Sequence, residues 1–77
     1  MTTRRLVGLS ARNQLMGIVE EVRIEGLLAE VRLRVGEQTL TSVITRDSAI
    51  DLGLEPGAPA IAVIKATEVM IGKEEGR

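Results

Sequence analysis

The sequence predicts an all-β fold, a small barrel of five strands with one short helix. Most of the chain alternates apolar and polar side chains with a period of two, as strands with one buried face do, and a single short stretch has helical features. Hydrophobic residues make up 44% of the 77 residues, enough for a folded core, but Phe, Trp and Tyr are absent. The core must therefore consist of aliphatic side chains and methionine.

Three strands are expected in the first two thirds of the chain. Residues 17–24 are rich in Ile and Val and end at Glu25-Gly26, a sequence typical of a hairpin turn. Residues 27–35 form the clearest strand, because Leu, Ala and Val alternate there with residues that are mostly charged. Gly36-Glu37 then leads into residues 38–45, a Thr-rich run that favours a strand.

The single helix is expected over residues 46–52. Thr45 has the side chain of an N-cap, and Gly53 stands where helices commonly end in a left-handed residue. This segment can turn three apolar side chains inward, namely Ile50, Leu52 and Leu54. The sequence Glu55-Pro56-Gly57 then signals a turn before the last strands.

The closing part of the barrel comes from residues 60–65 and 67–71, which form one long strand or two strands joined by a kink. Three strands, a helix and two closing strands match a five-stranded Greek-key barrel of the OB type. A sandwich is the alternative, because strand order cannot be read from one chain. This domain would span residues 9–71, with a short lead at 1–8 and a charged flexible tail at 72–77.

Composition argues against several classes of function. The net charge of −1 does not suggest a nucleic-acid interface or a polybasic membrane anchor, and no aromatic ring is present to stack on bases. Cys and His are both absent, so we expect neither an enzyme nor a metal centre. Without a secretory signal or a membrane-spanning run, the chain is expected to be cytoplasmic. A domain this small without disulfides is expected to gain stability by oligomerisation.

Hydrogen-bond donors are concentrated near the start of the expected barrel. Ser10, Arg12 and Asn13 offer a hydroxyl, a guanidinium and an amide, and the small Ala11 would let the backbone approach a ligand closely. A guanidinium fork is well suited to tetrahedral oxyanions, because it can bind two oxygens at once. The alternative interpretation is a polar turn in which Asn13 satisfies its own loop.

Two further elements could contribute to an oxyanion pocket. Thr45 and Ser48 lie in the first turn of the expected helix, where anions are favoured, although the same pair can simply cap the helix. Lys65 stands between Ile64 and Ala66 in a run typical of a buried strand, where a cation needs a negative partner. The alternative is an edge-strand lysine that points outward. An oxyanion site requires that these elements converge in space.

Four segments follow one another along the chain: Leu9-Ser-Ala-Arg-Asn-Gln-Leu15, Ile44-Thr-Arg-Asp-Ser48, Leu52-Gly-Leu54 and Ile64-Lys-Ala-Thr-Glu-Val-Met-Ile71. In this order they resemble the molbindins, a family of small molybdate-binding proteins. The resemblance runs over nearly the whole chain. It implies an OB-like barrel that assembles into a hexamer, a trimer of dimers, with oxyanion pockets at the subunit interfaces.

The resemblance also implies which residues bind the ligand. Carried over by motif, the residues that line the pocket from one subunit would be Ser10, the Ala11 amide, Arg12, Lys65 and Ala66, and Asn13 fits the same motif. Thr45 and Ser48 would come from a neighbouring subunit. The implied ligand is molybdate or tungstate, without a cofactor, and the implied role is storage and homeostasis. The alternative role is an oxyanion-sensing module that docks on a transporter or a regulator.

Overall fold

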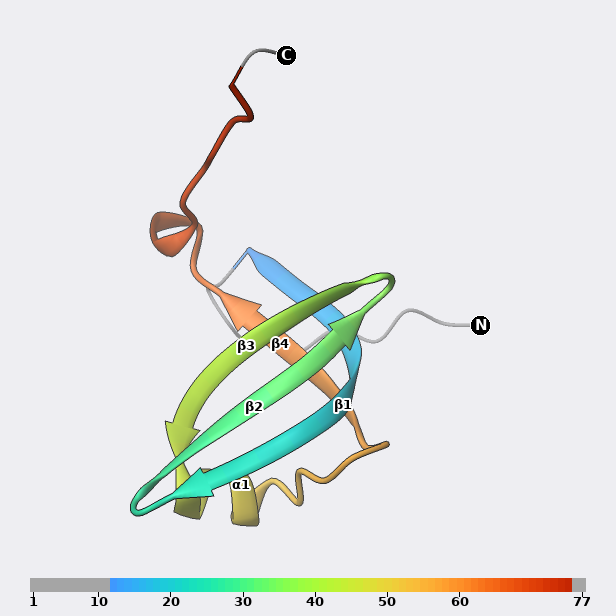
Figure 1. Ribbon diagram of the computed structural model, residues 1–77, viewed down its shortest axis with the longest axis vertical. Helices are drawn as coiled ribbons and strands as arrows, with labels where there is room; N and C mark the ends of the chain where they lie inside the picture. The colour runs from blue at the N-terminus through green and yellow to red at the C-terminus, as the bar shows by residue number, and fades with distance from the viewer. Residues whose placement is uncertain (1–11, 76–77) are drawn as a thin grey trace.

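The computed structural model describes residues 12–75 and consists of a curved antiparallel sheet with one short α-helix (Figure 1). The sheet has four strands in the order β3-β2-β1-β4. The elements along the chain are β1 (Asn13–Glu25), β2 (Leu28–Val35), β3 (Gln38–Thr45), α1 (Arg46–Asp51), β4 (Pro59–Ile64) and the 3-10 helix η1 (Ala66–Glu68). The helix α1 follows β3 directly and lies at the end of the sheet that carries the β1–β2 turn.

Strand β1 organises the sheet because its two halves pair with different neighbours. Its first half pairs with β4, from Asn13 to Ile18, and its second half pairs with β2, from Ile18 to Glu25. The expected strand began at residue 17, so this prediction placed its start too late. Gly17 lies inside the strand, where a β-carbon would come within 2.5 Å of the Arg34 carbonyl oxygen. The glycine therefore marks a close backbone approach and not a strand end.

Strands β2 and β3 agree with the expected alternation. Ala29, Val31 and Leu33 of β2 are buried, and each faces a β3 residue in a continuous antiparallel register. Leu27, the first apolar residue of the strand expected over residues 27–35, is 75% exposed and not buried with the others. It lies in the turn between β1 and β2, outside the sheet ladder, and this position removes it from the core.

The short helix has the expected caps but buries a different side chain. The Thr45 hydroxyl accepts a hydrogen bond from the Ser48 N–H, and Gly53 has φ +65 just after the helix. Ile50 and Leu52 are exposed, contrary to the expectation that they turn inward, and the helical residue that is buried is Ala49. A helix of six residues has room for about one side chain on its inner face. Leu54, beyond the helix, does pack against the core.

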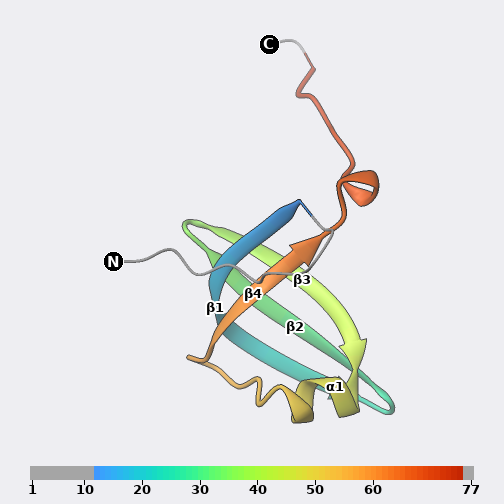
Figure 2. The ribbon, with the colours of Figure 1, turned by 180° about the vertical axis from the view of Figure 1, so that it is seen from behind.

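The expected fifth strand is not present in residues 12–75. Residues 66–68 form η1, and residues 69–75 contain no strand. The Glu68 N–H donates to the Lys65 carbonyl at 2.8 Å and closes a tight turn after β4. Beyond it the chain leads away from the sheet, as both views show (Figures 1 and 2). The sheet is therefore open, with β3 and β4 at its two edges.

The core of the described chain is small. Its central cluster consists of Val19, Val31 and Leu33, with partly buried aliphatic residues around it. Many large hydrophobic side chains are exposed, including several on β1 and β4. A single copy thus leaves much apolar surface uncovered. No helix in the described part of the chain is long and apolar enough to cross a membrane.

Candidate functional site

The candidate site lies where the start of β1 meets the end of β4. Asn13 pairs with Ile64 in the β1–β4 ladder, and the Asn13 side-chain Nδ2 donates a hydrogen bond of 3.2 Å to the Ile64 carbonyl. This is the last pair of the ladder, and Arg12 precedes it on one strand while Lys65 follows it on the other. We call Arg12, Asn13, Lys65 and Ala66 the cationic corner.

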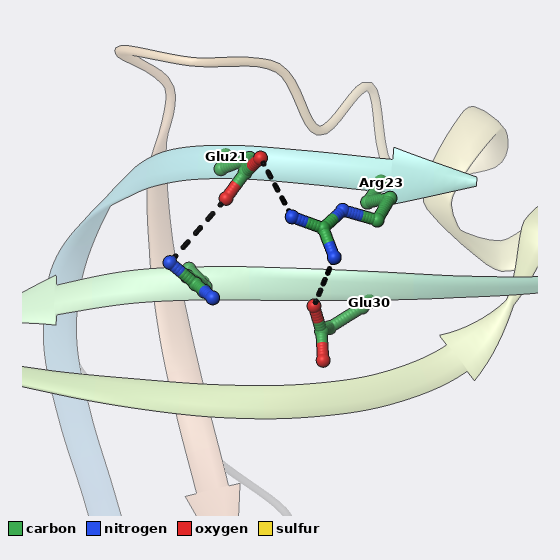
Figure 3. Close-up of polar contacts among 4 residues, drawn as sticks. Glu21, Arg23 and Glu30 are labelled. Atoms are coloured by element: carbon green, nitrogen blue, oxygen red, sulfur yellow. Dashed lines mark ion pairs between the residues drawn. The ribbon is translucent and has the colours of Figure 1, made fainter.

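The two cations of this corner differ from the other arginines that the structure describes. Arg23, Arg32, Arg34 and Arg46 each have a carboxylate within 4.0 Å. Figure 3 shows one such group, in which Arg23 lies between Glu21 and Glu30. Within residues 12–75, neither Arg12 nor Lys65 forms an ion pair. The corner therefore holds two positive charges that no carboxylate of the described chain neutralises.

The backbone around Lys65 supports its availability to a ligand. Lys65 is exposed and lies just outside β4, so the expectation of a lysine within a buried strand is wrong. It is the N-cap residue of η1, and its ammonium, which has donors but no acceptor, cannot cap the N–H groups of that helix. The first N–H groups of a helix have no acceptor within that helix, so the Ala66 N–H adds a backbone donor beside the ammonium. The corner thus presents donors of three kinds: guanidinium, ammonium and amide.

Thr45 and Ser48 form a separate pair of hydroxyl groups at the N-terminus of α1. Thr45 Oγ1 donates to Ser48 Oγ at 2.8 Å and accepts from the Ser48 N–H at 3.1 Å. Because Ser48 Oγ accepts this bond, its own proton is available to donate to another group. The pair therefore caps the helix, which is the alternative interpretation of these two residues, and the Ser48 hydroxyl can still donate one hydrogen bond.

The two groups of donors do not converge within one subunit. Thr45 pairs with Leu28, at the end of the sheet where β1 finishes, whereas Asn13 is the first residue of β1. Both ribbon views show α1 at the opposite end of the sheet from the β4 terminus (Figures 1 and 2). A ligand that contacts both groups must therefore lie between two copies of the chain. Ser10 and Ala11, also expected at the site, lie outside the described residues.

Sequence reasoning identified the residue types of the corner but missed two features. One is the Asn13–Ile64 hydrogen bond, which depends on strand register and has no local signature. The other is the set of exposed ion pairs on β1 and β2, in which Glu21, Arg23, Glu30 and Arg32 are linked to one another and Glu20 pairs with Arg34. Its signal was present, because both strands carry glutamates and arginines close together in the sequence.

The chain matches known proteins over most of its length. Residues 9–71 match the family model described as the TOBE domain. Molybdenum-pterin-binding protein 1 of Clostridium pasteurianum is 46% identical over 66 residues, which cover 84% of this chain and 97% of that protein.

Two solved structures also have the same fold. A molybdate binding protein from Sporomusa ovata superposes with a TM-score of 0.83 at 34% identity, over 87% of this chain and 100% of that one. The cytoplasmic molybdate-binding protein ModG, in a form with molybdate bound, gives a TM-score of 0.73 at 46% identity, over 75% of this chain and 42% of that chain.

Proposed function

From the premise that the chain belongs to the TOBE-domain family, as a molbindin-type protein, we propose that its cationic corner binds molybdate. The observation that carries this proposal is that Arg12 and Lys65 flank the last ladder pair, Asn13–Ile64, and that both are exposed and without a carboxylate partner among residues 12–75. The other described arginines are already paired within the sheet or at the helix. A doubly charged anion at the corner would balance the two free cations.

The chemistry of molybdate suits a site made of donors. Molybdate is a tetrahedral dianion at neutral pH, and its metal is saturated by oxo groups, so it needs N–H and O–H donors and no protein metal ligand. The Arg12 guanidinium, the Lys65 ammonium and the Ala66 N–H are such donors. A pocket without acceptors disfavours protonated phosphate, whose O–H would lack a partner. Tungstate has nearly the same size and charge, so the same site is expected to bind it.

The pocket is completed by a neighbouring copy. Thr45 and Ser48 lie at the far end of the sheet from the corner, and the free proton of the Ser48 hydroxyl makes it a donor for a ligand held by another subunit. Ser10 and the Ala11 amide would extend the site on the side of Arg12. The assembly is proposed to be a hexamer, a trimer of dimers, with the ligand at subunit interfaces. In this form the protein would store molybdate in the cytoplasm and release it reversibly.

Isothermal titration calorimetry with molybdate tests the proposal. One charge-assisted hydrogen bond contributes about 1.5–3 kcal/mol, so Arg12→Ala should weaken binding by roughly ten- to a hundredfold. Arg23→Ala is the matched control, because that arginine is equally a surface cation but is already paired with Glu21 and Glu30. Equal affinities for the wild type and both variants would contradict the assignment of the corner.

A further inference from the structure

The cationic corner carries more positive charge than the described chain balances. Arg12 and Lys65 flank the last pair of the β1–β4 ladder, both are exposed, and neither forms an ion pair within residues 12–75. The carboxylate nearest to Lys65 along the chain is that of Glu68, which is exposed and has no cation within 4.0 Å among the described residues. The corner therefore offers a ligand two positive charges that these residues leave unpaired.

The other polar side chain of the corner, that of Asn13, adds no charge. Its Nδ2 donates a hydrogen bond of 3.2 Å to the Ile64 carbonyl oxygen, so this carbonyl already has a donor. A carbonyl oxygen without a donor would repel an anion, because its partial charge is negative. Asn13 thus occupies an acceptor at the corner and leaves the charge of the two cations undiminished.

The groups proposed to come from the neighbouring copy add no net charge either. Thr45 and Ser48 contribute hydroxyl groups, which are neutral. The charged residues beside them, Arg46 and Asp47, pair with each other at 4.0 Å. Among the described residues proposed to line the pocket, Arg12 and Lys65 therefore bring all of the charge.

The charge of an anion enters its binding free energy in two opposing ways. The attraction to a fixed cation is proportional to the charge of the ligand, so each cation attracts a dianion about twice as strongly as a monoanion at the same distance. The cost of lost hydration rises with the square of the charge, so a dianion needs more compensation than a monoanion of equal size. Two unpaired cations supply this compensation better than one.

We propose that the cationic corner selects its ligand by charge as well as by shape, so that it accepts tetrahedral dianions and rejects tetrahedral monoanions of the same size. This inference rests on the proposed function and deepens it by defining the class of oxyanion. Perrhenate is the probe that isolates the charge, because it is a tetrahedral oxo anion of nearly the same size as molybdate with one negative charge. Both anions present four oxygens to the same donors.

Competition calorimetry on the full chain, with sodium molybdate and sodium perrhenate, tests the proposal. The wild type should bind molybdate more tightly than perrhenate. Lys65→Gln should weaken molybdate binding by roughly ten- to a hundredfold. Because the attraction is proportional to ligand charge, the same variant should weaken perrhenate binding by about the square root of that factor, roughly three- to tenfold. The preference for molybdate should therefore fall by about three- to tenfold. Lys65→Arg keeps the charge and should keep the preference, whatever it does to each affinity.

A second pair of variants changes the charge of the corner without touching either cation. Asn13→Asp and Asn13→Ala both remove the amide that donates to Ile64, but only the aspartate adds a negative charge. Asn13→Asp should lower the preference for molybdate about as much as Lys65→Gln does. Asn13→Ala should weaken both anions alike and leave the preference unchanged. Arg23→Gln is the control for the overall charge of the protein, because this arginine is already paired with Glu21 and Glu30.

Each outcome of these titrations decides the proposal. A preference that falls in Lys65→Gln and Asn13→Asp, but not in Lys65→Arg, Asn13→Ala or Arg23→Gln, supports selection by charge. An unchanged preference in Lys65→Gln, or an equal fall in Arg23→Gln, would overturn it. A wild type that binds both anions equally would overturn the charge selection and leave the proposed function standing. A wild type that does not bind molybdate would refute the proposed function, and the charge selection would fall with it.

Discussion

Substitution of Gly17 by alanine tests the bend in β1 that brings Asn13 beside β4. The new β-carbon would lie 2.5 Å from the Arg34 carbonyl oxygen and 2.9 Å from Leu33 Cγ, and real β-carbon contacts are not this short. Because the nearest atom belongs to the backbone of Arg34 and not to a flexible side chain, β1 and β2 must move apart to accommodate the new β-carbon. Inserting a group into a well-packed region costs about 1–3 kcal/mol, and the gain from restricting the unfolded chain offsets about 0.4–1 kcal/mol of it.

The net loss of roughly 1–2 kcal/mol should lower the Tm by about 5–15 °C for a domain of this size. Thermal unfolding followed by circular dichroism, at one fixed protein concentration, measures the shift. Gly72→Ala is the matched control, since nothing lies within 4 Å of its added β-carbon and its φ is not positive. If Gly17→Ala and Gly72→Ala have the same Tm, the close approach of β1 to β2 is not as described.

Two further substitutions test the cationic corner and the exposed ion pairs of β1 and β2 independently. Asn13→Ala removes the 3.2 Å hydrogen bond to the Ile64 carbonyl. This variant should bind molybdate about three- to tenfold more weakly, while its free energy of unfolding falls by only about 1 kcal/mol. A lower Tm with unchanged affinity would mean that the hydrogen bond does not position the cationic corner. Glu21→Gln removes two exposed ion pairs of 3.5 Å, and urea unfolding should show a loss below about 1 kcal/mol at low salt. This loss should vanish in 1 M NaCl, where the Debye length is about 3 Å, and a loss that persists there would contradict a screened surface interaction.

The elements that the sequence alone predicts well are those fixed by local chemistry. The alternation in β2 correctly indicated Ala29, Val31 and Leu33 as buried, and the Thr45 cap and the left-handed Gly53 were confirmed. Each of these depends on residues within a few positions of one another.

The errors concern features that depend on residues far apart in the chain. The expected strand over residues 17–24 starts too late, because the Ile and Val content marks only its second half, whereas the position of Gly17 inside the strand is set by the Arg34 carbonyl on another strand. Residues 67–71 have the composition of a strand, but a strand forms only where an edge is available, and the single chain places none beside them. The placement of Lys65 outside β4 follows from the same turn.

For the candidate site, residue types were predictable but the geometry was not. The donors of Arg12 and Lys65 could be identified one by one, and the β1–β4 register shows that both residues flank the same ladder pair, Asn13–Ile64. The same register separates them from Thr45 and Ser48 by the length of the sheet. That separation is the reason why the proposed pocket requires more than one subunit.

A crystal of the protein grown with sodium molybdate, with anomalous data collected at the molybdenum edge, tests the central claim most directly. We expect a molybdenum peak whose oxo groups lie within hydrogen-bonding distance of both the Arg12 guanidinium and the Lys65 ammonium, with Ser48 of another copy on the opposite side. A peak elsewhere on the sheet, or two cations that face solvent with no molybdenum between them, would contradict the claim.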